Sequence, residues 1–304
     1  MHPTSRAPSP IAEGVKAMYT LSQTEVDLFY ERGFHVARDV FSEGEIARLR
    51  EGYDYILALA GRSDLPEDLL QGTNGDVHIQ LQPPQSLLRA QAVQHLRKVQ
   101  WPARLHPVFE EIRTSPRLLA LLEPLLGTSL KQYINQINFK LPGSRIDFPW
   151  HQDVRPTPAF TDQVRTYVQT IISVDEASQE SGCIYVVPGS HRLGDLKAKR
   201  YAERQIEDKI DVRTAVPCLT QPGDVLMFTP YTVHGSKPNT SHKPRRSYIN
   251  GFVRADACTV GKWAFLDGQP VPITGDRDYS VFWPVGADRP YAPGGQRSGI
   301  GSTT

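Results

Sequence analysis

Residues 165–175 read RTYVQTIISVD, and polar and apolar side chains alternate along this run. An alternation with a period of two is typical of a half-buried strand, because successive side chains point to opposite faces of a sheet. One face of this predicted strand carries every second residue from Val164: Thr166, Val168, Thr170, Ile172 and Val174. Residues 131–141 show the same alternation, so we predict that the protein has a β-rich core.

Shorter strands are predicted at residues 183–187, 224–229 and 247–253, with turns that contain glycine and proline between them. Many short strands joined by such turns are typical of a β-sandwich or a closed barrel. Residues 191–213 are charged and poor in strand formers, and we expect a helical insertion or a mobile loop there.

Helix starts precede the strands. Ser22 and Ser42 are each followed three residues later by a glutamate, which is the capping-box pattern. After the second box, apolar residues recur at spacings of three and four, as on one face of a helix: Ile46, Leu49, Tyr53, Ile56 and Ala60. Ser115-Pro116 predicts a further helix start with Gly127 as its stop, and residues 34–36 predict a short strand.

The bulk composition is that of a folded protein without a strongly charged partner. The 304 residues are 39% hydrophobic and 22% charged, and the net charge of +1 gives no long-range field for nucleic acid or an anionic membrane. No apolar stretch reaches the roughly 20 residues that span a bilayer, and we expect no signal peptide. Three cysteines, an odd number without close pairs, suit a reducing compartment. We therefore expect a cytoplasmic protein that binds neither nucleic acid nor membrane, and its oligomeric state stays open.

We predict one domain with two loose ends. Aromatic side chains persist in the glycine- and proline-rich stretch after residue 260 and are expected to pack back onto the body: Trp263, Phe265, Tyr279, Phe282 and Trp283. The predicted divisions are a flexible arm at 1–20, a domain at 21–290 and a disordered tail at 291–304. Within the domain we expect a helical part at 21–128, a β core at 129–256 and a C-terminal packing segment at 257–290.

Trp150-His151-Gln152-Asp153 is the sharpest local motif. Residues two apart on a strand point the same way, so His151 and Asp153 can direct an imidazole and a carboxylate to one point. Two histidines and one carboxylate form the facial set that binds non-haem iron(II), with a third ligand from elsewhere in the chain. His-x-Asp by itself occurs often by chance, and its commoner role is a solvated loop or a structural histidine.

A second motif lies downstream, where a Gly223-Asp224 turn leads through an apolar strand to His234. Arg245 and Arg246 follow, eleven and twelve residues after this histidine. Arginine presents two parallel donors to a carboxylate, which lysine does not. Taken singly, the histidine has a plain explanation as a core or turn residue, and the arginines as a basic surface pair.

Five segments, taken in order, resemble the phytanoyl-CoA dioxygenase family of iron(II)- and 2-oxoglutarate-dependent oxygenases. They are residues 22–50, NFKLPG at 138–143, WHQD at 150–153, ESGCIYVVPGSH at 180–191, and the stretch 222–245 from Pro-Gly-Asp through His234 to Arg245. The resemblance covers roughly residues 20–255 and implies an α+β fold with a mainly β core. That core is a double-stranded β-helix, a jelly-roll or cupin-like barrel with N-terminal and flanking helices.

The resemblance also implies roles for individual residues. His151, Asp153 and His234 would hold iron(II), and Arg245 would bind the far carboxylate of 2-oxoglutarate. Arg246 is the alternative if the strand register differs by one. Four further residues would give polar contacts to the cosubstrate: Gln136, Asn138, Thr170 and Gln169. His191 would be structural and not a metal ligand.

The implied reaction uses O2 and converts 2-oxoglutarate to succinate and CO2 while an unactivated C–H bond of a small molecule is oxidised. Related halogenases replace the metal-binding carboxylate with a small residue, so Asp153 favours hydroxylation over halogenation. Desaturation, epoxidation and ring formation remain alternatives to hydroxylation. A natural-product intermediate or an amino-acid derivative is the kind of substrate that we expect.

Two other classes of protein compete with this interpretation. A cupin-type isomerase or binding protein would use similar histidines for a metal, but it has no need of an arginine after the second histidine. A purely structural β-sandwich would make the motifs coincidental. For an enzyme, the expected substrate walls are residues 71–100, 155–162 and 191–213, with Trp263 and Trp283. Arg155 could pair with an anionic substrate group, although a solvated arginine is the commoner case.

Overall fold

The computed structural model describes residues 18–73, 76–81, 95–143, 146–155, 159–196, 206–275 and 277–287. Most of the predicted N-terminal arm and the whole predicted tail lie outside the described residues. The same holds for parts of the expected substrate walls, at 74–75, 82–94, 156–158 and 197–205. The division of the chain into an arm, a domain and a tail stays a prediction.

Two antiparallel sheets form the core. The larger has the order β1 (Phe34–Ala37), β9 (Val225–Phe228), β6 (Tyr167–Ser173), β11 (Arg245–Arg254), β4 (Leu130–Lys140), β12 (Lys262–Leu266) and β13 (Gln269–Pro270). In addition, β3 (Leu96–Gln100) pairs with β4, and β2 (His78–Leu81) pairs with β3. The smaller sheet has the order β5 (Phe148–His151), β10 (His234–Ser236), β7 (Ile184–Val186) and β8 (Val216–Cys218).

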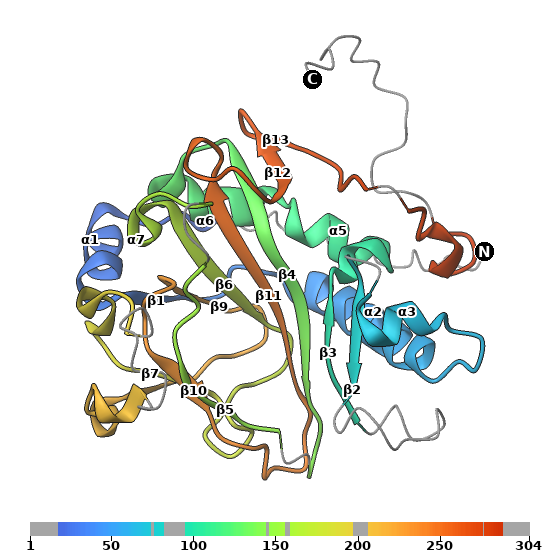
Figure 1. The fold of residues 1–304 in the computed structure, drawn as a ribbon, viewed down its shortest axis with the longest axis horizontal. Helices are drawn as coiled ribbons and strands as arrows, with labels where there is room; N and C mark the ends of the chain where they lie inside the picture. Colours follow the sequence, from blue (N-terminus) through green and yellow to red (C-terminus); the bar gives the residue numbers. More distant parts are fainter. Residues whose placement is uncertain are drawn as a thin grey trace, which may run out of the picture.

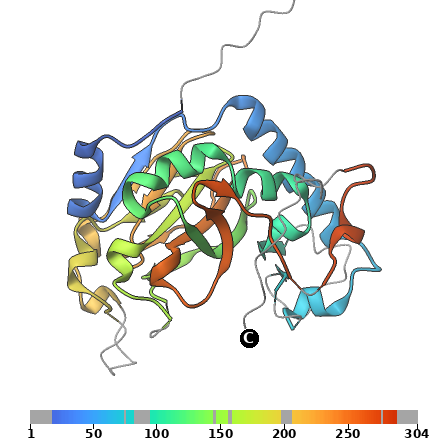
Figure 2. The ribbon, with the colours of Figure 1, turned by 90° about the horizontal axis from the view of Figure 1, so that it is seen from above.

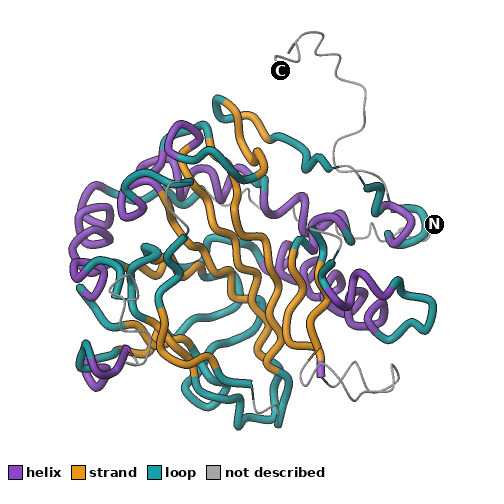
Figure 3. The backbone as a smooth tube through the Cα atoms, viewed as in Figure 1, coloured by secondary structure: helices purple, strands orange, loops and turns teal. Residues whose placement is uncertain are grey.

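From β4 to β11 the chain passes back and forth between the two sheets, with β7 and β8 as consecutive strands of the smaller one. This winding of eight antiparallel strands is a jelly roll. Figure 1 shows β6, β11 and β4 side by side, with β5, β10 and β7 at the lower left, and Figure 3 shows the same strands in orange. The predicted double-stranded β-helix is therefore confirmed.

Helices from the first part of the chain cover one side of the strands, as the view from above shows (Figure 2). They are α1 (Gln23–Arg32), α2 (Glu43–Ala60), α3 (Glu67–Gln71), α5 (Pro107–Arg113) and α6 (Pro116–Leu126), and a short α7 (Gln163–Thr166) precedes β6. Both predicted capping boxes are present, at Ser22 and at Ser42. Short 3-10 turns complete the described elements: Pro102–Arg104, Ser190–Leu193, Ile206–Asp208, Val212–Thr214, Ala255–Ala257 and Ser280–Phe282.

The main apolar core lies between these helices and the outer face of the larger sheet. Tyr53 of α2 is fully buried, and its ring centroid lies 5.1 Å from that of Phe139 on β4 and 5.6 Å from that of Phe109 on α5. Because side chains alternate along β4, Phe139 faces this core while Gln136 and Asn138 face the interior between the sheets. Burial against the helices thus fixes which polar residues of the sheet point inward.

The predicted strand at 165–175 is shorter in the structure. Residues up to Thr166 form α7, and β6 begins at Tyr167. The Thr166 hydroxyl donates to the carbonyls of Thr161 and Asp162, a helical back-bond that competes with strand pairing. At 191–213, where we expected a helical insertion or a mobile loop, the described residues include three separate 3-10 turns and no longer helix.

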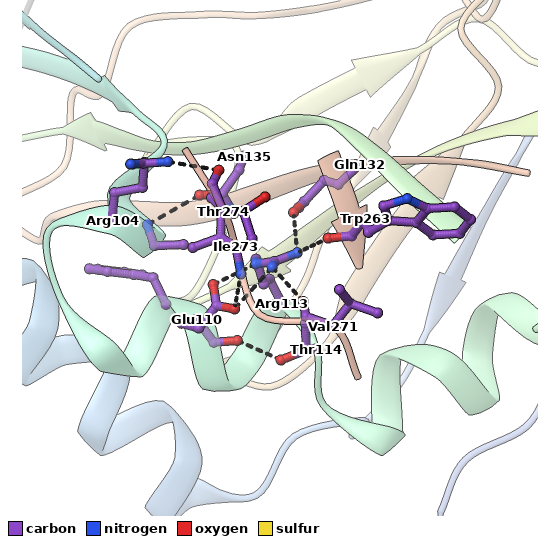
Figure 4. Close-up of polar contacts among 12 residues, drawn as sticks. Arg104, Glu110, Arg113, Thr114, Gln132, Asn135, Trp263, Val271, Ile273 and Thr274 are labelled. Carbon is purple, nitrogen blue, oxygen red and sulfur yellow. Dashed lines mark hydrogen bonds and ion pairs between the residues drawn. The ribbon is translucent and has the colours of Figure 1, made fainter. Parts of the chain in front are cut away.

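The C-terminal segment is tied to the body by a buried ion pair (Figure 4). Arg113 of α5 is fully buried and donates to both carboxylate oxygens of Glu110, at 2.6 and 2.9 Å. It also donates to the carbonyls of Trp263 and Val271, while Glu110 accepts from the amide of Ile273. This network holds the chain beyond β11 against α5. No helix in the described part of the chain is long and apolar enough to cross a membrane.

Candidate active site

The two sheets bring His151, Asp153 and His234 together. His151 ends β5 and lies directly opposite His234 of β10 in the antiparallel pairing. Asp153 Oδ1 is 3.9 Å from His151 Nε2, and its Oδ2 is 3.8 Å from His234 Nε2. Among the described residues, these form the one group of histidine, cysteine and acidic side chains whose ligand atoms, within 4.8 Å of one another, could hold a metal ion.

The sequence predicted that His151 and Asp153 share one strand, and this is wrong in detail. The strand ends at His151, and Asp153 lies in the irregular segment that follows. Gln152 between them is buried and holds that segment in place. Its amide donates to the carbonyls of Gly194 and Tyr231, and its oxygen accepts from the amide of Leu196. The direction of the carboxylate therefore depends on tertiary contacts of Gln152 and not on strand alternation.

Each histidine ring is oriented by a backbone carbonyl. His151 Nδ1 lies 2.7 Å from Pro149 O, and His234 Nδ1 lies 3.0 Å from Thr232 O. A carbonyl accepts a hydrogen bond, so it fixes the proton on Nδ1 and leaves Nε2 as the free ligand atom. In both rings this Nε2 is the atom that faces Asp153. The donor set of two nitrogens and one carboxylate fits iron(II) with positions left open on one side.

Burial favours the neutral, metal-binding form of His234. This side chain is enclosed, with its ring 4.4 Å from the Phe228 ring and 4.1 Å from the His151 ring. Desolvation, with a further contribution from His151, lowers the pKa of His234 to about 4. The ring is therefore uncharged near neutral pH, as a metal ligand must be.

A cavity of about 400 Å³ opens beside the three side chains, between the two sheets. Arg245 lines this cavity and is 6% exposed, yet no ion pair or hydrogen bond of its guanidinium is found among the described residues. Burial lowers the pKa of Arg245, since the charged form has lost its water. An enclosed cation that faces a cavity without a partner is suited to bind a carboxylate there.

Arg246, the alternative to Arg245, points to the opposite face of β11. It donates to Asp175 at 2.8 and 3.1 Å and to Asp54 at 3.0 Å, and it does not line the cavity. Adjacent residues of a strand face opposite sides, so only one of the two arginines can reach the interior. The alternative of Arg246 is therefore wrong, because its side chain does not reach the cavity.

The four predicted cosubstrate contacts divide in the same way. Gln136, Asn138 and Gln169 line the cavity, and Gln136 Nε2 donates to Asn138 Oδ1 at 2.6 Å. Thr170 does not line it, because β6 turns this side chain outward, where its hydroxyl donates to the carbonyl of Asn250 at 2.9 Å. The expectation for Thr170 is wrong, and the alternation of β6 is the reason. His191, as predicted, is not part of the group of three candidate metal ligands, and its Nε2 lies 2.9 Å from Tyr30 O.

Three further cations line this cavity. Two of them lie within residues 71–100, a predicted substrate wall, but neither was predicted individually. Arg97 and Lys98 of β3 both line it, although nothing in their local sequence distinguishes them from surface residues. Arg155 also lines it and is half-buried, with its guanidinium carbon 5.4 Å from the ring centroids of Tyr133 and of Tyr167. The expectation of a solvated arginine is therefore wrong.

The sequence model of one family, described as "Phytanoyl-CoA dioxygenase (PhyH)", matches residues 29–247. The chain belongs to this family. Methylphosphonate hydroxylase of Gimesia maris is 27% identical over 230 residues, which are 75% of this chain and 79% of that protein. The probable alpha-ketoglutarate-dependent hypophosphite dioxygenase of Stutzerimonas stutzeri is 28% identical over 245 residues, 75% of this chain and 77% of that protein.

Among solved structures, EctD from S. alaskensis with 2-oxoglutarate and 5-hydroxyectoine has a TM-score of 0.61 at 20% identity, over 84% of this chain and 89% of that one. The same protein has been solved with bound Fe. As a member of the phytanoyl-CoA dioxygenase family, this chain is an iron(II)- and 2-oxoglutarate-dependent oxygenase. The cupin-type alternative without oxygenase activity is not supported.

Proposed function

We propose that His151, Asp153 and His234 bind the iron, and that Arg245 binds the far carboxylate of 2-oxoglutarate. The observation that carries this proposal is the unpaired, enclosed guanidinium of Arg245 in the same cavity as the three ligand side chains. One end of 2-oxoglutarate must chelate the metal while the other end needs a cation, and this cavity offers both. Gln136 and Asn138, which line the wall opposite the metal ligands, would give additional polar contacts to the cosubstrate.

The chain's own residues supply orientation and shielding. When bound, iron and 2-oxoglutarate activate O2 for oxidation of a C–H bond, with succinate and CO2 as the other products. The fixed Nδ1 protons keep both histidine Nε2 atoms available, and Gln152 keeps the Asp153 carboxylate in place. The apolar side chains of Phe228, Ile171 and Ile249 form part of the wall and limit water next to the reacting groups.

We further propose that the substrate is a small molecule that enters this cavity. The volume is at the low end of the roughly 300–1,000 Å³ of ligand pockets, and the cosubstrate occupies part of it. The two relatives described above are named for methylphosphonate and hypophosphite, both small phosphorus oxyanions. The three buried free cysteines, Cys183, Cys218 and Cys258, suit our expectation of a reducing, cytoplasmic setting.

The test is anaerobic addition of iron(II) and then 2-oxoglutarate to chelator-treated protein, followed by visible absorption spectroscopy. A weak charge-transfer band is expected, because it reports a 2-oxo acid chelating iron(II). The band should be absent in His234→Ala, and Asp153→Ala should not release succinate from 2-oxoglutarate in the presence of O2. Full turnover by Asp153→Ala would contradict the ligand assignment. Iron binding without the band would contradict the role of Arg245.

A further inference from the structure

We infer that the second substrate of this enzyme carries a small dianionic oxyanion group of the phosphonate or phosphate class, and that Arg155 binds this group. The inference rests on the proposed function, because it takes Arg245 as the partner of 2-oxoglutarate. It adds a substrate class and a specificity-determining residue for the same cavity.

The cavity is lined by an excess of positive charge. Arg97, Lys98, Arg155 and Arg245 line it, and among its described lining residues Asp153 is the one acid. Four cations against one carboxylate leave three net positive charges. Iron(II) carries two positive charges and the 2-oxoglutarate dianion carries two negative charges. Together they leave this excess of positive charge unchanged. A protein of net charge +1 has concentrated these cations at one place.

Three of these cations have no ion pair among the described residues. No carboxylate there lies within ion-pair distance of Arg97, Lys98 or Arg155, and Asp153 attracts Lys98 and Arg155 only from a greater distance. The Nε atoms of Arg97 and Arg155 are buried and have no hydrogen-bond partner in the described part of the chain. Half-buried cations and buried donors without a partner are costly unless something pairs with them, so their presence in a cavity indicates an anionic ligand.

Arg155 is held in place by contacts of its backbone and of its side chain. Gln163 fixes its backbone on both sides, accepting from the Arg155 amide at 2.8 Å and donating to its carbonyl at 3.1 Å. Its guanidinium packs on Tyr133 and Tyr167 and donates to the Tyr167 hydroxyl at 3.2 Å. That hydroxyl donates in turn to Gln169 at 2.6 Å. Such a preorganised fork suits recognition of an oxyanion better than a mobile surface side chain does.

Arg155 and Arg245 belong to different parts of the cavity wall. Tyr167, the hydrogen-bond partner of Arg155, lies opposite Val253 on β11, eight residues beyond Arg245 on the same strand. At about 3.3 Å per residue this is roughly 26 Å along β11 between the position opposite Tyr167 and the backbone of Arg245. We therefore take the two guanidiniums to bind different anions. Arg155 is also only two residues from Asp153, which places its anion beside the metal ligands.

The experiment is anaerobic calorimetric titration of the protein loaded with iron(II) and 2-oxoglutarate. The probes are methylphosphonate, methyl phosphate, acetate and acetamide. Binding of methylphosphonate or methyl phosphate at least tenfold tighter than acetate, with no detectable binding of acetamide, supports the inference. The preferred dianion then distinguishes a phosphonate from a phosphate ester. Equal binding of acetate, or no binding of either dianion, overturns the inference.

Two variants show whether the anion sits on Arg155 or only on the metal. Arg155→Gln should weaken dianion binding by about 10- to 100-fold, because hydrogen bonds to a charged group are lost. Arg213→Gln is the matched control, since Arg213 is 88% exposed and pairs with Asp211 at the surface. Unchanged binding in Arg155→Gln would overturn the assignment.

The failure of this inference can be told apart from that of the proposed function. The charge-transfer band with 2-oxoglutarate should persist in Arg155→Gln, which also shows that the variant is folded. If that variant does not fold, Lys98→Gln, on β3, should still weaken dianion binding severalfold. Loss of the band in the unmodified protein would contradict the proposed function and not the anion site alone.

Discussion

Replacing Arg245 and Arg246 in turn by methionine should give opposite results, although the two residues are neighbours. Arg245 is enclosed without an ion pair among the described residues, whereas Arg246 pairs with Asp175 and Asp54. Methionine keeps a long unbranched side chain and removes the charge. Both substitutions therefore change the charge by one unit and differ in which face of β11 they affect.

For Arg245→Met, removal of an unpaired buried cation should raise the free energy of unfolding of the cofactor-free protein by about 1 kcal/mol, or about 2 °C in melting temperature. The same change leaves the far carboxylate of 2-oxoglutarate without its partner, which costs about 3–5 kcal/mol. At 1.4 kcal/mol for each tenfold change, the affinity for 2-oxoglutarate should fall roughly 100- to 4,000-fold.

For Arg246→Met, the stability should fall and the affinity should not. Asp175 retains Arg50, whose Nε lies 3.4 Å from its Oδ1, so it does not become an isolated buried charge. The Asp54 carboxylate is mostly exposed and contributes little. We expect a loss of about 1–2 kcal/mol in the free energy of unfolding. The affinity for 2-oxoglutarate should stay within about twofold.

The assays are calorimetric melting of the metal-free proteins and titration of 2-oxoglutarate into the anaerobic iron(II) proteins, followed by visible absorption. The reasoning is refuted if Arg245→Met destabilises the protein and binds 2-oxoglutarate normally. It is equally refuted if Arg246→Met is the variant that loses the cosubstrate, because the register of β11 would then be wrong.

Three further predictions concern stability and the shape of the cavity. His106 caps α5 through Nδ1, which accepts from the Val108 amide at 3.2 Å, and burial lowers its pKa to about 4. Since the folded pKa is below the ordinary 6.5, its stabilising effect is present above pH 6.5 and is lost toward pH 4. As the pH falls over this interval, the free energy of unfolding measured in urea should decrease by about 2 kcal/mol more in the native chain than in His106→Asn. Equal decreases in the two proteins would contradict this. Arg113→Met should lower the free energy of unfolding by about 3–5 kcal/mol, because Glu110 is left buried and unpaired. A loss below about 1 kcal/mol in urea unfolding would show that water reaches the ion pair. In Gly251→Ala the added Cβ would lie 1.9 Å from the Tyr167 hydroxyl that contacts Arg155. The free energy of unfolding should therefore fall by about 1–3 kcal/mol, and methylphosphonate should bind more weakly. Unaltered binding would show that this hydroxyl does not position the guanidinium.

Local pattern in the sequence determined much of this protein. The alternation in residues 131–141 and 165–175 predicted strands that form the centre of the larger sheet, because a strand with one face on a core must alternate. Both capping boxes were readable, since they depend on residues three apart. The order of motifs predicted the family and also the three candidate metal ligands that the structure brings together.

Tertiary structure decided what depends on the face that a residue presents and on partners distant in the sequence. Whether Arg245 or Arg246 enters the cavity, and whether Gln169 or Thr170 does, follows from which face of each strand packs on the helices. Arg97, Lys98 and Arg155 look like surface cations in the sequence, because nothing adjacent to them records that they line a cavity between the two sheets. Charge without an internal partner is a property of the folded arrangement, and this property distinguishes the candidate anion site from the solvated arginines elsewhere in the chain.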